Sequence, residues 1–327
     1  MRGGVTRTPA RAGGCVRVPA RTYYREWHGH TREHLEAVYP AAREGGRRIV
    51  WLLGDSSLDN KAWVGHEPKA AALNGYEHVL DPPVSRRDVC YWLNARAARE
   101  DAKVACVNCA VEATTLASRR RFFGLRKTLW QQDTFAAAKM QHDDVVAVSI
   151  GGNDVALRPT VMTILSMLRL VHASPERICS PDSSDWWPMR HICWLFGRAV
   201  ERYLEDVLEG AGALPSRCAV CSIYYPCETG DGWASFALRK LRYDTDPAKL
   251  QLIIKTIHER AVSKIRLRVR GRHIPVVPVP LSEVLDPKDP DDYVAMVEPS
   301  PIGGSKIADR LWDELLGGGG QGAGGRA

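Results

Sequence analysis

The sequence predicts a three-layer α/β/α domain built on a five-stranded parallel sheet. Five short apolar segments lack the alternation of polar and apolar residues that is typical of half-exposed strands. Segments with helical periodicity lie between them, and strands that alternate with helices indicate a parallel sheet covered on both faces. A chain of 327 residues is long enough to bury such a core. The predicted strands cover residues 48–53, 103–108, 144–150, 218–224 and 273–279.

Helical spacing is clearest in residues 247–269, where most apolar residues recur every three or four positions. Asp246 and Pro247 form a start signal for this helix. A second pattern covers residues 114–141, with a turn near Gly124. The other predicted helices cover residues 86–99, 160–171, 191–208 and 304–316. Because ligands of such sheets bind at the carboxyl ends of the strands, we expect the functional residues there.

The positive charge of the chain is concentrated at its N-terminus. Residues 1–25 contain six arginines and no acidic residue, and the rest of the chain has 39 basic and 38 acidic residues. A nearly neutral body argues against a nucleic-acid partner. We expect residues 1–30 to be a disordered arm or an organelle transit peptide, because their composition cannot form a core alone.

The remaining chain is expected to form one domain over residues 31–316, followed by a flexible glycine-rich tail over residues 317–327. No apolar run is long enough to span a bilayer, and no secretory signal is visible. Two segments exceed ordinary loop lengths, an insert over residues 158–214 and a stretch over residues 225–246. Both contain tryptophans, which either form a lid or substrate wall or pack a small core of their own.

Nine cysteines are scattered along the chain, and four of them form two Cys-x-x-Cys pairs. Cys106 and Cys109 lie in one predicted strand region, and Cys218 and Cys221 lie in another. Residues three apart on a strand point to opposite faces, so neither pair converges easily on a metal ion. We interpret these cysteines as buried thiols that behave as small apolar side chains. No metal is therefore predicted.

A serine follows the first predicted strand directly, in the sequence Gly54-Asp55-Ser56. A glycine permits a tight exit from the strand, and Ser56 then lies at the edge of the sheet where ligands bind. The same three residues also suit an ordinary helix cap. Their position at the strand end makes Ser56 the candidate nucleophile.

A second polar group follows the third predicted strand, in the sequence Gly151-Gly152-Asn153-Asp154. The two glycines let the backbone turn and approach a ligand closely. The Asn153 amide would then lie at the same sheet edge as Ser56, where it can donate a hydrogen bond to an oxyanion. A capping role before a helix is the structural alternative for this pair of polar residues.

Residues 107–112 end the second predicted strand, and residues 298–308 precede the last predicted helix. Together with the Ser56 and Asn153 segments, and in this order, they resemble the sequence blocks of the SGNH/GDSL hydrolases. The resemblance extends from about Arg48 to Leu316, apart from the long insert. It implies a flavodoxin-like fold, no cofactor and hydrolysis through a serine nucleophile.

The resemblance also implies roles for individual residues. It makes Ser56 the nucleophile, and it forms the oxyanion hole from the backbone N–H groups of Ser56 and Ala110 and the side chain of Asn153. The family usually has glycine at the position of Ala110. Alanine keeps the main-chain donor, although its methyl group narrows the pocket.

The last block departs from the family pattern, because Glu298 occupies the place of the catalytic histidine and Ala295 the place of its aspartate. A buried carboxyl can have a pKa high enough to act as a base, so Glu298 is the candidate base. A histidine from elsewhere is the alternative, either His66 or His191. Asp292 is a candidate supporting residue because it is close in sequence, and the supporting set also includes Asp55 and Asp154, which flank Ser56 and Asn153.

These residues predict an esterase or lipase that forms an acyl-Ser56 intermediate. The expected partner is a small-molecule ester, a lipid or an acylated glycan. The alternative is an impaired protein that binds such a ligand without turnover, because loss of one triad member greatly reduces catalysis.

Overall fold

The computed structural model describes residues 17–25, 28–66, 68–119 and 129–317. Its central sheet consists of β2 (Arg48–Gly54), β6 (Val104–Asn108), β7 (Val145–Ser149), β8 (Arg217–Cys221) and β11 (Val276–Val279). The strands lie in the order β6-β2-β7-β8-β11, and every neighbouring pair is parallel. In chain order this is 2-1-3-4-5, the arrangement of flavodoxin-like sheets. The predicted fold class is confirmed.

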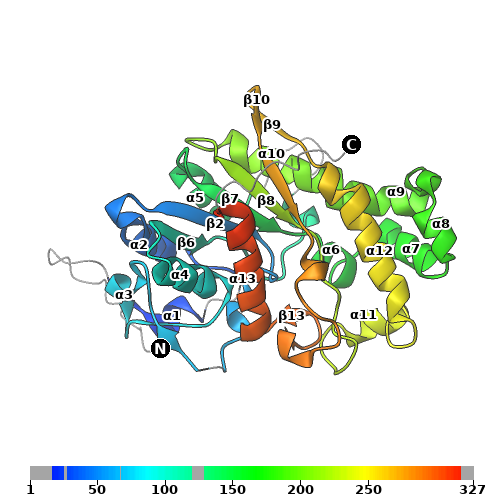
Figure 1. Ribbon diagram of the computed structural model, residues 1–327, viewed down its shortest axis with the longest axis horizontal. Coiled ribbons are helices and arrows are strands. Elements are labelled where there is room, and N and C mark those ends of the chain that lie inside the picture. The colour runs from blue at the N-terminus through cyan, green and yellow to red at the C-terminus, as the bar shows by residue number, and fades with distance from the viewer. Residues whose placement is uncertain (1–16, 26–27, 67, 120–128, 318–327) are drawn as a thin grey trace, which may run out of the picture.

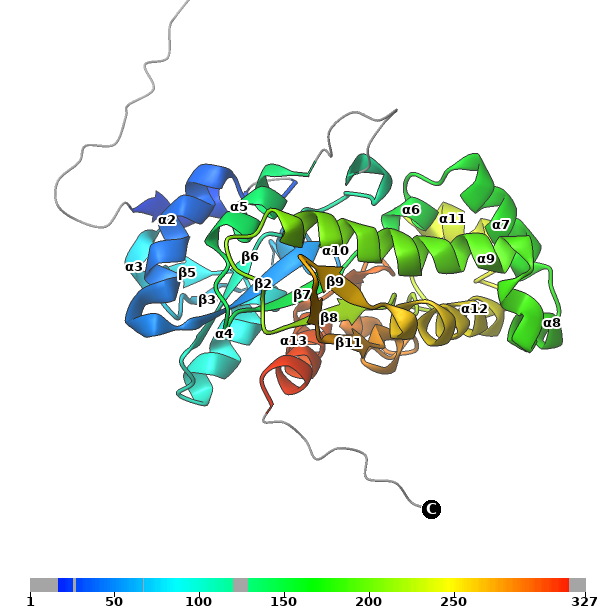
Figure 2. The same cartoon turned by 90° about the horizontal axis from the view of Figure 1, so that it is seen from above.

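Helices cover both faces of this sheet (Figure 2). Helices α2, α5 and α10 lie on one face, and α4 and α13 lie on the other, where they pack against each other. The helices are α1 (Ala20–Tyr23), α2 (Arg32–Arg43), α3 (Tyr76–Val79), α4 (Val89–Arg99), α5 (Gln131–Lys139), α6 (Asn153–Ala156), α7 (Val161–Val171), α8 (Pro175–Cys179), α9 (Trp187–Trp194), α10 (Val200–Glu209), α11 (Ser235–Lys240), α12 (Pro247–Arg260) and α13 (Pro301–Leu315).

Several short strands form pairs outside the central sheet. Strand β1 (Val18–Pro19) runs parallel to β4 (Leu80–Asp81). The antiparallel pairs are β3 (Ala70–Ala71) with β5 (Val84–Ser85), β9 (Leu267–Val269) with β10 (Arg272–Ile274), and β12 (Tyr293–Val294) with β13 (Glu298–Pro299). The last of these hairpins carries Glu298, so it matters for the site.

The buried carboxylate of Asp144 joins the sheet to the helix layer. It accepts hydrogen bonds from the backbone N–H of Ile49 at 2.9 Å and from the indole of Trp51 at 2.9 Å. Arg43, at the end of α2, donates two further bonds of 2.7 and 2.6 Å. A two-pronged guanidinium–carboxylate pair fixes distance and angle together, so this contact sets the position of α2 on β2.

Helices α6 to α9, α11 and α12 gather at one end of the molecule, beyond the carboxyl ends of β7 and β8 (Figures 1 and 2). Most of them come from the predicted insert 158–214 and from the stretch 225–246. The helix predicted over residues 191–208 is present as α9, a π-helical segment (Leu195–Ala199) and α10. The two long segments therefore form a helical wall at the edge where ligands were expected.

The prediction of a disordered arm over residues 1–30 is wrong for residues 17–25 and 28–30. Residues 1–16 and 26–27 lie outside the described residues. Tyr23 is only 1% exposed, and its ring stacks on that of His30 with centroids 4.0 Å apart. Val18 pairs with Leu80 in the short parallel sheet. The apolar residues at the end of the arm bury against the domain, which composition alone did not indicate.

Three predicted elements have different bounds in the structure. The predicted helix over residues 114–141 is helical only in α5 and in a short 3₁₀ turn (Ala117–Arg119) among its described residues, and residues 120–128 lie outside them. The helix predicted over residues 247–269 ends at Arg260. Leu267 and Val269, at the end of the predicted range, belong to strand β9 instead. The strand predicted over residues 273–279 is divided between the β9–β10 hairpin and β11.

The predicted last helix begins earlier than residue 304. Helix α13 starts at Pro301, and the side chain of Ser300 caps it by accepting hydrogen bonds from the N–H groups of Ile302 and Gly303 at 3.1 Å. The serine oxygen satisfies N–H groups that have no partner within the helix, and proline suits the first position because its missing N–H would have no intrahelical partner there. The helix start thus holds the chain directly after Glu298.

Candidate active site

The turn that carries Ser56 requires glycine at its first position. Gly54 has φ +114°, and a Cβ atom there would lie 1.8 Å from the carbonyl oxygen of Ser149. The backbone N–H of Asp55 then donates to that oxygen at 2.9 Å, and the Asp55 side chain accepts from the N–H of Ser57 at 3.2 Å. Ser56, between them, is 7% exposed and lines a cavity. The first strand thus delivers the serine to the expected edge.

A second turn with a glycine at positive φ places Asn153 at the same cavity. Gly151 has φ +116°, and a Cβ atom there would lie 2.7 Å from the ring of Phe196. Asn153 begins α6, and its side-chain nitrogen donates a hydrogen bond to the carbonyl of Thr114 at 3.0 Å. This bond fixes the orientation of the amide and leaves the second hydrogen of its NH₂ group for another acceptor.

Glu298 reaches the cavity from the β12–β13 hairpin, and it is 3% exposed. Asn60 ties this hairpin to the Ser56 loop: its side chain donates to the carbonyl of Pro299 at 2.9 Å and accepts from the N–H of Val89 at 3.1 Å. The indole of Trp233 donates to Glu298 Oε1 at 3.2 Å. Trp233 thus holds the carboxyl group from the side that faces the helical wall.

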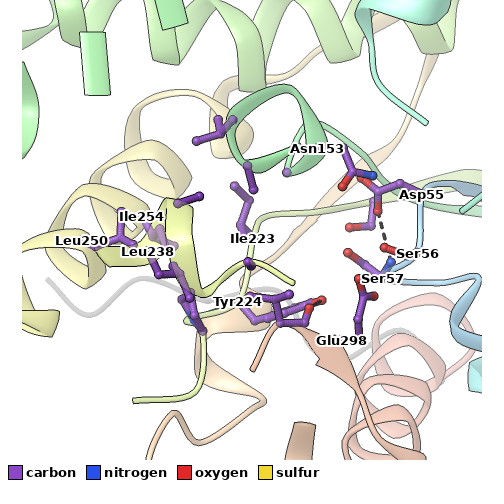
Figure 3. Close-up of a pocket in the computed structure, with 18 of the residues that line it drawn as sticks. Asp55, Ser56, Ser57, Asn153, Ile223, Tyr224, Leu238, Leu250, Ile254 and Glu298 are labelled. Carbon is purple, nitrogen blue, oxygen red and sulfur yellow. Dashed lines mark hydrogen bonds between the residues drawn. The ribbon is translucent and has the colours of Figure 1, made fainter. Parts of the chain in front are cut away.

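Figure 3 shows the Glu298 carboxyl group turned toward Ser56 and Ser57, with Asp55 and Asn153 on the opposite side of the serine. All five line the cavity. The structure therefore brings together four residues that the sequence nominated for the site: Asp55, Ser56, Asn153 and Glu298. Glu298 Oε2 is buried and makes no well-formed hydrogen bond within the described residues, which leaves it as an acceptor beside the serine.

Burial raises the pKa of Glu298 well above its usual value. The nearby Ser56 hydroxyl opposes the rise because a donor beside the carboxylate favours its ionised form, whereas the charges of Glu112 and Asp55 add to the rise. Burial also raises the pKa of Asp55 to about 6, and that of Glu112 to about 7 with a further contribution from Asp59. The site is thus a cluster of carboxyl groups that hold protons more tightly than usual.

Ala110 departs from its predicted role. Its backbone N–H donates to the side-chain oxygen of Asn108 at 2.9 Å, the residue is fully buried, and it is not among the described residues that line the cavity. In this arrangement the N–H is already paired within the protein. The geometry therefore does not support Ala110 as an oxyanion donor.

Two of the predicted supporting residues, Asp154 and Asp292, accept hydrogen bonds from backbone N–H groups and do not contact the cavity that contains Ser56. Asp154 accepts hydrogen bonds from the N–H groups of Leu116 at 2.7 Å and Ala117 at 3.1 Å, so it holds the loop beside Asn153. Asp292 accepts from the N–H of Asp286 at 2.9 Å and forms an ion pair with Lys306 at 2.6 Å. Neither of the two lines the cavity within the described residues.

The two alternative histidines lie away from the serine. His66 is exposed. His191 contacts the Thr163 hydroxyl through Nε2 at 3.1 Å and stacks on Trp194. The described residues that line the cavity include no histidine. Within that part of the chain, Glu298 is the titratable group turned toward Ser56 from the place of the family base.

Sequence reasoning missed three residues that act on the site. Trp233 was noticed only as a tryptophan of a long loop, and Glu112 only as the end of a resembling segment. Arg119, which is 4% exposed, donates to the carbonyl of Gly54 at 3.2 Å and to Asp133 at 3.0 Å. Nothing in the local sequence of these residues indicated that they would approach Ser56 or Glu298.

Eight cysteines lie in the described residues, and the interpretation as buried thiols is confirmed for the four of the two Cys-x-x-Cys pairs. All eight are free, and Cys106, Cys109, Cys218 and Cys221 are buried. Burial raises the pKa of Cys218 and of Cys221 to about 12, which keeps them protonated thiols. No group of three or more histidine, cysteine, aspartate or glutamate side chains that could hold a metal occurs in the described residues. A search of the same residues for a helix long and apolar enough to cross a membrane also finds none.

Comparison with known proteins finds no matching family model and no matching curated protein. Solved structures do align with the chain. A family 3 carbohydrate esterase from Clostridium thermocellum is 12% identical over 83% of this chain and 96% of its own, with a TM-score of 0.36. An acetylxylan esterase from Geobacillus stearothermophilus is 13% identical over 82% of this chain and 94% of its own, with a TM-score of 0.37. A GDSL-like lipase from Parabacteroides merdae is 12% identical over 83% and 95%, with a TM-score of 0.37.

Proposed function

We propose that this protein is a carboxylic ester hydrolase in which Ser56 forms an acyl-enzyme and Glu298 acts as the general base. The observation that carries the proposal is the buried Glu298 carboxyl group turned toward Ser56 (Figure 3). A general base is most effective when its pKa lies near the working pH, and burial moves the pKa of Glu298 upward from the ordinary glutamate value. The substitution of glutamate for histidine is therefore compatible with base catalysis.

In the proposed first step, Ser56 Oγ attacks the ester carbonyl carbon while its proton moves to Glu298. The tetrahedral intermediate collapses as the bond to the alcohol oxygen breaks, and Glu298 returns the proton to that oxygen. Water then attacks the acyl-Ser56 ester and gives its proton to Glu298. Collapse of the second intermediate releases the carboxylic acid, and the proton returns to Ser56 Oγ.

Two donors are available for the oxyanion in this scheme. The backbone N–H of Ser56 donates to no acceptor within the described residues, and the Asn153 amide keeps one hydrogen after its bond to Thr114. Each such donor stabilises the negative charge that develops on the carbonyl oxygen of the ester, in a site from which water is excluded. The nearby Asp55 carboxyl works against this charge when it is ionised, so its raised pKa, about 6, limits the pH range of activity.

The raised pKa of Glu298 also favours one alternative, binding of an acyl or glycan ligand without turnover. A carboxyl group that stays protonated at the working pH cannot take the proton of Ser56. In that case the cavity and the oxyanion donors remain, but the nucleophile is not activated. The two functions therefore differ in whether Ser56 is reactive.

Labelling of the purified full-length protein with a fluorophosphonate probe separates them, because only an activated serine reacts quickly. We expect the wild type to label and Ser56→Ala to remain unlabelled. Glu298→Gln should slow labelling by about 10²- to 10⁴-fold, the usual contribution of a general base. Ser57→Ala is the matched control, since Ser57 is the adjacent serine in the same cavity, and it should label normally.

Labelling or p-nitrophenyl butyrate hydrolysis that persists in Ser56→Ala would refute the serine mechanism. An inert wild type that gains activity in Glu298→His would instead support the binding-only alternative.

A further inference from the structure

The cavity beside Ser56 is lined by polar residues at one end and by apolar residues at the other. Figure 3 shows Asp55, Ser56, Asn153 and Glu298 at one end and Leu238, Leu250 and Ile254 at the other, with Ile223 and Tyr224 between them. Beyond the serine, the described lining residues include no charged side chain. The apolar lining also includes Met167, Phe196, Leu241, Ile253, Ile257 and Val297.

The few polar atoms in this apolar part are already paired. The Tyr224 hydroxyl donates to the carbonyl of Val297, and the Trp233 indole donates to Glu298. A sugar ring buried here would leave several hydroxyl groups without hydrogen-bond partners, which is unfavourable. A hydrocarbon chain has no such requirement and gains free energy from every methylene that leaves water.

The apolar face of α12 explains how this lining arises. Leu250, Ile253, Ile254 and Ile257 recur at helical spacing, a pattern that ordinarily packs against a core. Here the stripe faces α11 and α6 across the cavity, so part of it contacts open space. Helix α12, together with the helices of the two long segments, therefore gives the serine an apolar pocket.

We propose that this cavity binds the hydrocarbon chain of an acyl ester, with the carbonyl carbon beside Ser56. The substrate class is then esters of medium or long alkanoic acids, and not acetyl groups on a glycan. The inference rests on the proposed function for the position of the carbonyl group, whereas the affinity for an alkyl chain depends only on the lining.

The outer surfaces of the same helices agree with a lipid substrate. On α7, Val161 is 73% exposed, and Met162, Ile164 and Leu165 are also exposed; on α11, Phe236 is 68% exposed. Large apolar side chains grouped on a soluble surface commonly mark an interaction site. An ester carried in a micelle or membrane would meet apolar surface on the helices that wall the cavity.

The first test measures kcat/KM for p-nitrophenyl acetate, butyrate, octanoate and decanoate. We expect a rise of about fourfold for each methylene that the cavity buries, until the chain fills it. Ala237→Phe and Ala156→Phe narrow the cavity from two sides and should each lower the octanoate-to-acetate ratio at least about tenfold. Arg239→Phe is the matched control, because Arg239 is exposed on the same helix as Ala237. It should leave the ratio unchanged.

The second test measures binding without turnover. Nile red, a neutral apolar dye, is bound to the full-length Ser56→Ala protein and displaced by decanol or by butanol. Displacement by decanol at concentrations at least about 100-fold lower than butanol, weakened in Ala237→Phe, supports the proposal even if no ester is hydrolysed. Rapid hydrolysis with no preference for longer chains, together with equal displacement by both alcohols, overturns the proposal and leaves the esterase function standing.

Discussion

Glu298 occupies a position that favours the protonated carboxyl group. Its carboxyl is buried, one oxygen accepts from the Trp233 indole, and the Glu112 and Asp55 carboxyls lie close enough to raise its pKa further. A histidine in the same place would lose its charge through burial, whereas a glutamate gains its proton. Both residues are then neutral beside Ser56, but a neutral histidine can still accept a proton, whereas glutamate can accept one only when it is ionised.

This contrast predicts the pH dependence of catalysis. Because the base is the deprotonated form, kcat/KM should rise with pH and reach half of its maximum well above the usual glutamate pKa of about 4.3. Glu298→Gln should remove this limb and lower kcat/KM by about 10²- to 10⁴-fold. The measurement is hydrolysis of p-nitrophenyl butyrate from about pH 5 to pH 10.

Asp55 supplies the control, since its pKa of about 6 also lies within that range. Ionisation of Asp55 should lower kcat/KM as pH rises through about 6, and Asp55→Asn should remove only this fall. A rising limb that persists in Glu298→Gln would contradict the role of Glu298.

At the scale of the elements, Asp133 on α5 helps to hold the turn that carries Ser56, through its contact with Arg119. Its carboxylate accepts hydrogen bonds from Arg119 at 3.0 Å and from the Tyr203 hydroxyl of α10 at 2.7 Å. Arg119 in turn donates to the carbonyl of Gly54, two residues before Ser56. Asp133 and Arg119 are almost completely buried, so each charge depends on the other for compensation.

We expect Asp133→Asn to lower the free energy of unfolding by about 3–5 kcal/mol, because it leaves the Arg119 charge buried and unpaired. Tyr203→Phe removes a single hydrogen bond to the same carboxylate and should cost about 1–3 kcal/mol. Urea denaturation of the two variants measures the difference. Equal, small losses would mean that the Arg119–Asp133 pair contributes no more than an ordinary hydrogen bond.

Across the whole molecule, several carboxyl groups are buried with raised pKa values. Burial raises the pKa of Asp88 to about 7, that of Glu112 to about 7 and that of Asp55 to about 6. Between the pKa of the unfolded chain and these values, the folded protein holds protons that the unfolded chain has lost. The free energy of unfolding therefore falls as pH rises from about 4 to about 7, by about 1.4 kcal/mol per pH unit for each group while it titrates.

Asp88→Asn tests this dependence with little change in structure. Asp88 caps α4 by accepting from the N–H of Tyr91 at 2.8 Å, and asparagine caps helices equally well. The variant should lose less stability than the wild type between about pH 4 and pH 7 and be the more stable protein at pH 7, as measured by urea denaturation at several pH values. Asp143→Asn, at an exposed position, is the control and should follow the wild type. A variant slope equal to that of the wild type would contradict the prediction.

The local sequence pattern was sufficient to predict the strands of the sheet, but it did not predict the structure of every segment around the sheet. Strands such as Arg48–Gly54 are continuous apolar runs, and their alternation with helices specifies a parallel sheet whatever the details of packing. The arm was misjudged because Val18 and Tyr23 bury against the domain rather than against one another. Residues 267–269 continue the helical spacing of the segment before them, yet they pair with β10, and such pairing is decided outside the segment itself.

The sequence by itself determined the sheet, the placement of Ser56 and Asn153 at the ends of two of its strands, and the presence of Glu298 where the resembling family has histidine. These features depend on periodicity and on glycines with positive φ, which are local. Only the tertiary structure decided that Trp233 holds Glu298, that Asn108 occupies the Ala110 N–H, and that the α12 stripe lines a cavity. The Trp233 contact and the lining of the cavity join segments far apart in the chain, which packing brings together and no local pattern encodes. The Asn108 contact spans only two residues, but it depends on a side-chain orientation that the sequence does not specify.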